Sequence, residues 1–370
     1  MPMAPGAHTQ RVTSTSHPVP ALPPIGPAWY GSVMGTGILA TLTEKLLNHI
    51  PFAHDVAIAF LAASWVLLVV LSAGFALRIV QRPRTFRESV LHHSTTPQWG
   101  MVSMGIMSVG SATLTVAPAV NPQFSATATF LNIVLWSVGT VVGIVSAVGF
   151  GARLIGSDVG SPTTVWGLAV VPPMVSATTG SPIVPILPGV SAQLWMLTGL
   201  VACFFLSLFV GAIVFITAYH HHWSRQRIPL AASASAWIPL GVVGQSTAAA
   251  QSLASQARHL VIPEALDAVQ ALANAYGIAM FTLGIPLTCW ATFVTIRGFM
   301  GRMAFNPGWW SLTFPIGTLS LGTHLLGKGT DVPIFGTVSL ILCCILMCTW
   351  TVCAIGSASA LRAQLSTQLR

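Results

Sequence analysis

The sequence predicts an all-α integral membrane protein with ten transmembrane helices, and three observations support this prediction. The 370 residues are 54% hydrophobic and only 6% charged, with a mean hydropathy of +0.77, which is too apolar for a water-soluble chain. Apolar stretches of about 20 residues, the length that crosses the hydrocarbon of a bilayer, occur ten times. Prolines recur at even spacing before alternate stretches, which indicates an internal repeat.

The predicted spans divide the chain into a transmembrane domain and two tails. The spans are, in chain order, 28–48, 56–78, 99–118, 128–151, 163–180, 191–218, 230–250, 270–296, 309–326 and 333–358. Residues 1–26 are rich in Pro, Ser, Thr and His and lack the apolar segment of a signal peptide, so we expect a disordered cytoplasmic tail. Residues 27–358 form the transmembrane domain, and residues 359–370 form a short cytoplasmic tail.

Each repeat consists of two spans, of which the first carries helix breakers. The repeats begin, about 70 residues apart, at Pro27, Pro97, Pro162, Pro229 and Pro307. An aromatic residue follows each proline, and a second breaker comes about two turns later, at Gly35, Gly105, Pro172–Pro173, Pro239 and Pro315. This length is that of a helical hairpin with its loops. We therefore expect five helical hairpins in a quasi-five-fold arrangement.

The two spans of each hairpin differ in composition. Odd-numbered spans are rich in Gly, Ser and Thr, whereas even-numbered spans are mostly aliphatic and suit contact with lipid. Broken helices expose backbone groups that hydrocarbon cannot satisfy, so the odd spans are predicted to form an inner ring that lines a central pore. Their small residues fit either close helix packing or the pore lining. The pore-lining candidates are Gly31, Gly35, Thr36, Gly105, Ser108, Pro172, Pro239, Gly241 and Gly317.

The central turns of the odd spans carry no acidic or basic residue, which suits weak binding of small anions. Two polar residues on these spans, Gln245 and His324, are possible anion contacts. The alternative for each is a polar side chain that forms its hydrogen bonds within a contact between helices.

The basic residues predict the orientation of the chain. With the N-terminus inside, 12 of the 15 Lys and Arg residues face the cytoplasm, as the positive-inside rule requires. The outer side keeps only Lys45, Arg258 and Lys328, together with five acidic residues, Glu44, Asp55, Glu264, Asp267 and Asp331. We expect a multi-pass protein of the plasma (inner) membrane with both termini in the cytoplasm. Because this topology explains the net charge of +8, no nucleic-acid partner is expected.

Two histidine clusters raise the alternative of a membrane enzyme with a bound metal. These clusters are His92–His93 and His220–His222, and the only acidic residue near them is Glu88. Adjacent residues of a helix point about 100° apart, so neighbouring histidines do not converge on one ion. We therefore expect no metal site, no cofactor and no enzymatic activity.

Two stretches resemble a known family of membrane proteins. The stretches PAWYGSVMGTGIL from Pro27 and NPGWWSLTFPIGTLSLGT from Asn306 are similar to the tellurite-resistance/dicarboxylate transporter family, within the voltage-dependent anion channel superfamily. It includes TehA-type proteins, plant slow anion channels, fungal malate permeases and sulfite exporters. The likeness covers about residues 25–360. It implies a homotrimer in which every protomer has its own pore, occluded by a phenylalanine at the position of Phe314, before the kinking Pro315.

The resemblance implies a membrane anion channel or transporter for C4-dicarboxylates such as malate, sulfite, chloride or nitrate. The wording MGTGI in the first span is closer to the malate and sulfite transporters than to the plant channels. A proton-coupled exporter of organic acids or sulfite is the alternative, with His324 as its candidate for protonation. Five similar hairpins favour a fixed central pore, since alternating access calls for two halves. The other interpretation of Phe314 is an ordinary packed aromatic.

Overall fold

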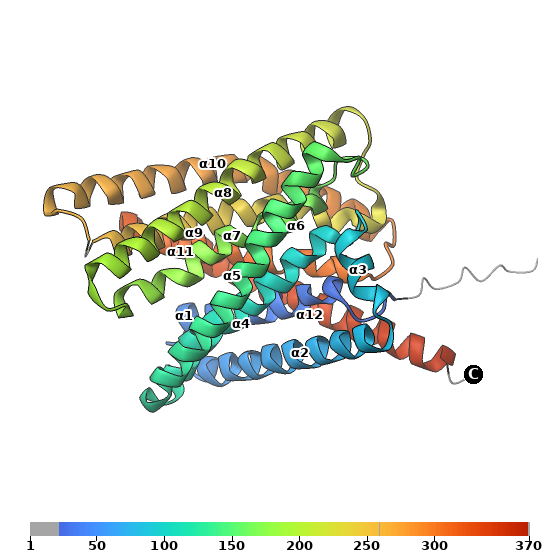
Figure 1. Cartoon of the computed structure of the whole chain (residues 1–370), viewed down its shortest axis with the longest axis horizontal. Helices are drawn as coiled ribbons and strands as arrows, with labels where there is room; N and C mark the ends of the chain where they lie inside the picture. Colours follow the sequence, from blue (N-terminus) through green and yellow to red (C-terminus); the bar gives the residue numbers. More distant parts are fainter. Residues whose placement is uncertain (1–21, 259, 369–370) are drawn as a thin grey trace, which may run out of the picture.

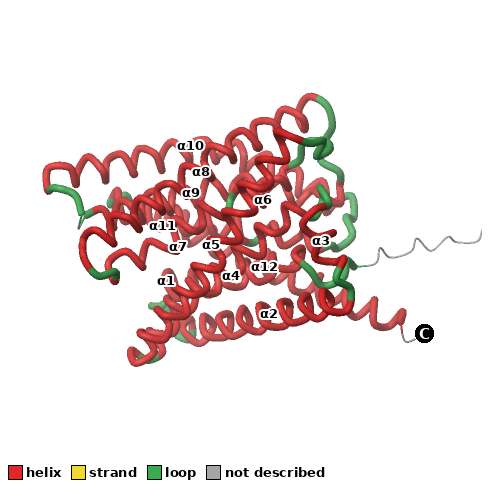
Figure 2. The backbone as a smooth tube through the Cα atoms, viewed as in Figure 1, coloured by secondary structure: helices red, strands yellow, loops and turns green. Residues whose placement is uncertain are grey.

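The computed structural model describes residues 22–258 and 260–368, which form helices and no strand. Loops gather mainly at two opposite ends of the helices (Figure 2). The first described residues and the end of the last helix lie at the same end of the molecule (Figure 1). Apart from residues 22–26, the tail predicted over residues 1–26 lies outside the described residues. The predicted tail at 359–370 is helical as far as Gln368.

The α-helices are α1 (Tyr30–Leu47), α2 (Ala53–Gln81), α3 (Arg84–Leu91), α4 (Trp99–Val120), α5 (Ser125–Gly156), α6 (Gly167–Val170), α7 (Pro172–Gly180), α8 (Gly189–Ser224), α9 (Ile238–Ala257), α10 (Pro263–Met300), α11 (Phe314–Thr330) and α12 (Pro333–Gln368) (Figure 1). The 3-10 helices are η1 (Pro27–Trp29), η2 (Thr96–Gln98), η3 (Pro122–Phe124), η4 (Thr164–Trp166), η5 (Ser181–Ile186), η6 (Leu230–Trp237) and η7 (Pro307–Leu312). The Pro and Trp residues of the sequence repeat lie in or beside η1, η2, η4, η6 and η7.

Six helices in the described part of the chain are long and apolar enough to cross a membrane: α2, α4, α5, α8, α10 and α12. A seventh span results if α6 and α7, which meet at a 44° bend, are counted together with the 3-10 turns that flank them. The helices α1 and α9 are not in this set, because Gly, Thr, Ser and Gln lower their hydropathy, and α11 is also short, with 17 residues. Hydropathy thus accounts for six or seven of the ten predicted spans.

The helices fall into two classes by exposure. The most apolar windows of α2, α10 and α12 are only 22% buried, whereas that of α4 is 72% buried. Helix α1 is buried without interruption from its first residue to Thr43. Side chains such as Val66, Val69 and Val70 on α2 are exposed, which a bilayer accommodates and water does not.

The buried helices touch one another in a closed sequence. Helix α1 contacts α4, α4 contacts α7, α7 contacts α9, α9 contacts α11, and α11 contacts α1. Each of these five helices also packs against the long helix that follows it in the chain, which is α2, α5, α8, α10 or α12.

The prediction that glycines break the inner helices is wrong for two of them. Helices α1 and α4 run without interruption through Gly35 and Gly105. Glycine keeps its amide N–H and so preserves the helical hydrogen bond, whereas proline loses it. The breaks occur before prolines: α6 ends beside Val171, and a 3-10 helix changes to an α-helix just before Pro239 and Pro315.

Glycines instead allow close approach between the inner helices. A Cβ atom on Gly244 of α9 would overlap the backbone of Thr318 and Leu319 on α11. On the other side of this contact, a Cβ on Gly322 of α11 would lie 2.5 Å from the carbonyl oxygen of Gly244. The two backbones therefore pack directly against each other, as small residues permit in membranes.

We predict that Gly244→Ala destabilises the protein by about 1–3 kcal/mol, because the added methyl group forces α9 and α11 apart. Thermal unfolding of the purified protein in detergent measures this effect. The matched control is Gly149→Ala on α5, where a Cβ meets nothing within 4 Å. This control is expected to be neutral or slightly stabilising. Equal unfolding temperatures for the two variants would contradict the packing argument.

Candidate functional site

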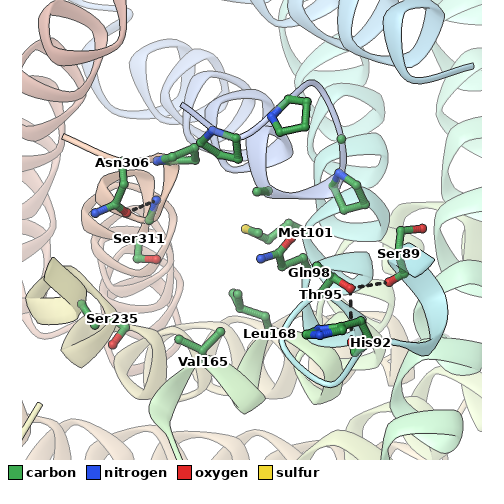
Figure 3. Close-up of a pocket in the computed structure, with 18 of the residues that line it drawn as sticks. Ser89, His92, Thr95, Gln98, Met101, Val165, Leu168, Ser235, Asn306 and Ser311 are labelled. Carbon is green, nitrogen blue, oxygen red and sulfur yellow. Dashed lines mark hydrogen bonds between the residues drawn. The ribbon is translucent and has the colours of Figure 1, made fainter. Parts of the chain in front are cut away.

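A cavity of 650 Å³ lies where α1, α4, α6, α9 and α11 begin, and we call it the N-terminal cavity. Polar side chains around it come from several 3-10 helices, including Gln98 of η2, Ser235 of η6 and Ser311 of η7 (Figure 3). His92, which directly follows α3, also lines it, and its carbonyl oxygen accepts a hydrogen bond from the Thr95 hydroxyl. The first turns of α1, α4, α9 and α11 bring backbone N–H groups with partial positive charge to this end, which favours anions.

Further along the same helices the space narrows to 20 Å³, about the room of one water molecule, and we call this the constriction. It is lined by Gly31, Met34, Met101, Met104, Leu168, Val171, Ile238, Gly241, Trp310, Ser311, Phe314 and Pro315. Phe314 is only 5% exposed, and Met34 and Met104 are equally buried. An apolar ring of this width excludes hydrated ions.

A second large cavity of 570 Å³ lies toward the C-terminal ends of the same helices, and we call it the C-terminal cavity. Hydroxyl and amide side chains dominate its lining, for example Thr41, Ser111, Thr178 and Gln251. Three basic side chains also line it, which are Lys45, Arg258 and Lys328.

Many of the lining residues recur at helical spacing. On α1 they are Gly31, Met34, Thr41 and Lys45; on α9 they include Ile238, Gly241, Ser252 and Ser255; on η7 and α11 they include Ser311, Phe314, Leu321, Leu325 and Lys328. This spacing keeps them on one face of a helix. The same face therefore borders the constriction and the C-terminal cavity, so the two spaces follow one another along the helices.

A layer of residues lies between the constriction and the C-terminal cavity. Counting three or four positions along each helix from the constriction gives Ile38, Ser108, Val175, Gln245 and Thr318, and all five are buried. Ser108 donates to the carbonyl of Met34, and Thr318 donates to the carbonyl of Pro315. The Gln245 amide has no hydrogen-bond partner within residues 22–258 and 260–368, although it is only 2% exposed.

Four of the sequence-predicted site residues meet at the constriction: Phe314, Pro315, Gly31 and Gly241. Gly35 and Gly317 lie at the contact of α1 with α11, against Thr313 and Ile38 respectively.

Other pore-lining candidates lie at contacts between helices. Thr36 accepts a hydrogen bond from Trp350 Nε1 and so faces α12. Gly105 packs beside Tyr30, and Pro172 beside Gly143. Pro239 is buried in the first turn of α9.

His324, the second predicted anion contact, is not in the lining of these cavities. It is half-buried beside the C-terminal cavity and interacts electrostatically with Lys45 and Lys328.

Sequence reasoning missed the methionines and aliphatic residues of the constriction, such as Met34, Met104 and Ile238. A methionine in an apolar helix looks the same in the sequence whether it faces a core or a pore. The basic residues of the C-terminal cavity did leave a signal, because they are the cations that the predicted topology places outside.

The histidine clusters do not gather metal ligands. In the part of the chain that the structure describes, no group of three or more His, Cys, Asp or Glu residues is placed to hold a metal ion. The rings of His92 and His93 stack on each other with centroids 4.5 Å apart. His222 Nδ1 lies 3.0 Å from the carbonyl oxygen of Gln226.

Comparison with known proteins identifies relatives of this chain. The chain is 23% identical to a sulfite efflux pump of Trichophyton rubrum over 333 residues, covering 88% of this chain and 87% of the pump. It is 25% identical to a sulfite efflux pump of Arthroderma otae over 336 residues, with the same coverage. An uncharacterised transporter of Methanocaldococcus jannaschii is 25% identical over 310 residues, covering 82% of this chain and 83% of that protein.

The voltage-dependent anion channel family, SLAC1, matches residues 24–358. This match includes the helices around the constriction and both large cavities. The chain therefore belongs to the voltage-dependent anion channel family.

Proposed function

We propose that this protein moves small anions across the plasma (inner) membrane through a path between α1, α4, α6–α7, α9 and α11, with Phe314 as its gate. The observation that carries the proposal is the sequence of N-terminal cavity, constriction and C-terminal cavity, each bordered by these same helices. As a member of a channel family, the protein is a channel or transporter and not an enzyme.

The charge of the path favours anions. In the described residues, no Asp or Glu lines the constriction or the C-terminal cavity. The N-terminal cavity is lined by one acid, Glu88, and one base, Arg78, so their charges offset each other and the helix N-termini there attract anions. At the other end, basic side chains attract negative charge. Gln245 lies between the two, and its unpaired amide N–H₂ is suited to donate to a passing anion without trapping it.

Local backbone geometry supports Phe314 as the gate. The 3-10 helix η7 ends at Leu312, and Thr313 (φ −106°, ψ −69°) joins it to α11. Pro315 lies in the first turn of α11, where its missing N–H breaks no helical hydrogen bond and its fixed φ sets the start of the helix beside the phenylalanine. Gly31 and Gly241 line the same space and bring no side chain into it. Rotation of one ring is then enough to widen the constriction.

The wider architecture in this proposal is ten transmembrane helices, as five hairpins in quasi-five-fold arrangement, over residues 27–358. The closed sequence of contacts among the inner helices supports it. Both termini are assigned to the cytoplasm, which agrees with the common end of the molecule at which the described chain begins and α12 ends (Figure 1). A homotrimer with one path per protomer is the assembly that the family resemblance suggests.

Sulfite is the first candidate substrate, because curated relatives of similar length are sulfite efflux pumps. C4-dicarboxylates such as malate, and also chloride and nitrate, suit the same lining without fixed charge at the constriction. A proton-coupled exporter is the second candidate, for which His324, half-buried beside the C-terminal cavity, is the candidate for protonation.

Phe314→Ala is expected to raise anion flux into proteoliposomes by about tenfold or more, because an apolar plug is removed. Sulfite, malate, chloride and nitrate are compared in the same preparation. The control is Phe60→Ala on α2, whose ring packs 5.0 Å from that of Trp350. Unchanged flux in a folded Phe314→Ala protein would overturn the gate.

Gln245→Leu is expected to lower flux roughly tenfold, the effect of losing one hydrogen bond to a charged group. Since the amide has no partner in the described chain, the unfolding temperature should not fall. Gln123→Leu, at an exposed position in η3, is the control for a generic amide loss. A fall in stability with normal flux would show a structural role instead.

A channel-like path predicts that flux follows the membrane potential and that His324→Gln keeps flux within about twofold of wild type. A pH-sensitive dye in the liposome lumen measures accompanying proton movement. Uphill anion transport driven by a pH gradient, lost in His324→Gln, would instead establish the proton-coupled exporter.

A further inference from the structure

The C-terminal cavity collects all the cations that the predicted topology leaves outside. Lys45 comes from the last turn of α1, Lys328 from the last turn of α11, and Arg258 from the C-terminal end of α9. The outer side also holds five acidic residues, which are Glu44, Asp55, Glu264, Asp267 and Asp331. None of the five lines the cavity. The basic residues of the outer side thus line the cavity and the acidic residues do not, and the positive-inside rule does not explain this separation.

The three cations have no acidic partner. The acid nearest in sequence, Glu44, pairs with His54, with Oε2 and Nδ1 2.8 Å apart. Within residues 22–258 and 260–368, no carboxylate forms an ion pair with Lys45, Arg258 or Lys328. Lys45 and Lys328 are close enough for their charges to interact. Like charges in one cavity repel each other, and no carboxylate among the described residues pairs with them to offset this repulsion.

A network of amide side chains holds Arg258 at the cavity wall. Arg258 Nη2 donates to Gln270 Oε1 at 3.1 Å, and Gln270 Nε2 donates to Gln251 Oε1 at 2.9 Å. Gln251 Nε2 donates to Asn274 Oδ1 at 3.0 Å, and Asn274 Nδ2 donates to the carbonyl of Gly329 at 2.8 Å. The network joins α9, α10 and α11. Within the described residues, the bond to Gln270 is the one hydrogen bond of the guanidinium, so its remaining donors have no partner there.

The remaining polar groups of the wall are largely satisfied by their own helices. Thr41 donates to Gly37 O, and Thr178 donates to Met174 O. Thr115 and Ser181 bond to the backbone in the same way. Among the described residues, the neutral polar side chains that face the cavity without a side-chain hydrogen bond are Ser111, Ser252, Ser255 and Gln256, and the only charges there are the three positive ones.

We infer that the C-terminal cavity is a binding site for a small, doubly charged oxyanion, held by Lys45, Arg258 and Lys328. The inference rests on the proposed path, of which this cavity is the outer end. Coulomb energy scales with the charge of the ligand, so the site favours doubly charged anions over chloride. An anion held here lies between the constriction and the outer solution, where it is released or captured.

The competing explanation is the helix dipole. A cation in the last turn of a helix is stabilised by the carbonyl groups that end there, with no ligand involved. This explanation predicts that neutral variants lose stability equally with and without anions. The proposed site predicts a loss of anion affinity.

Equilibrium binding of sulfate and chloride to the purified full chain in detergent tests the site, at constant ionic strength with gluconate as the replacement. The variants are Lys45→Gln, Arg258→Gln and Lys328→Gln. Each is expected to weaken sulfate binding about fourfold and chloride binding about twofold, since doubling the charge squares the factor. Lys328→Arg keeps the charge and should bind as wild type does. The matched control is Arg362→Gln, an exposed position on α12.

Sulfate affinity that is unchanged in all three neutral variants would overturn the site. Flux measurements on the same proteins separate this result from failure of the proposed function. Sulfate binding without anion flux in wild type would remove the transport proposal and leave the site standing. Flux with equal half-saturating sulfate concentrations in wild type and variants would remove the site and leave the path standing.

Discussion

Hydrocarbon offers no partner for a backbone amide or carbonyl, and the rest of this structure depends on that constraint. The interrupted helices α6–α7, α9 and α11 lie inside, behind the long apolar helices α5, α8, α10 and α12. At the interruptions the backbone still bonds locally: Met174 N donates to Val171 O, and Gly317 N donates to Thr313 O. Two layers of helices follow from this need, with the irregular backbone in the inner layer.

Burial of the inner helices then explains their composition. Hydroxyl side chains on them bond to carbonyls one turn earlier, as Thr43 does to Leu39 and Thr247 to Val243. Such side chains are polar in the sequence but expose no unpaired group to the core. Glycines let the backbones approach, as where Gly100 of α4 meets Leu168 of α6 and where Gly244 of α9 meets α11. Low hydropathy in α1, α9 and α11 is therefore compatible with a position inside a membrane protein.

The inner faces of these helices border the cavities and the constriction. Large cavities at both ends narrow to an apolar constriction around Phe314, Met34 and Met104. Along the proposed path, partial positive charge comes from helix N-termini at one end. Basic side chains provide full positive charge at the other end. A small anion meets attraction at both mouths and only weak donors between them. Attraction at the mouths with weak binding between them suits conduction of an anion more than its tight retention.

The sequence by itself determined the membrane class, the repeat, the division into apolar and small-residue helices and the family. These properties are local, because composition, proline spacing and hydropathy are written in consecutive residues. It also named Phe314, Pro315, Gly31 and Gly241, which meet at the constriction.

Only the tertiary structure decided which small residues border the constriction and the cavities and which pack between helices. Gly35 meets Thr313, a residue from the opposite end of the chain, and no periodicity within α1 reveals that contact. In the same way, Lys45, Arg258 and Lys328 come from three separate helices and converge only in the fold. The period of a helix identifies its faces, but the neighbour that each face meets is set by packing between distant segments.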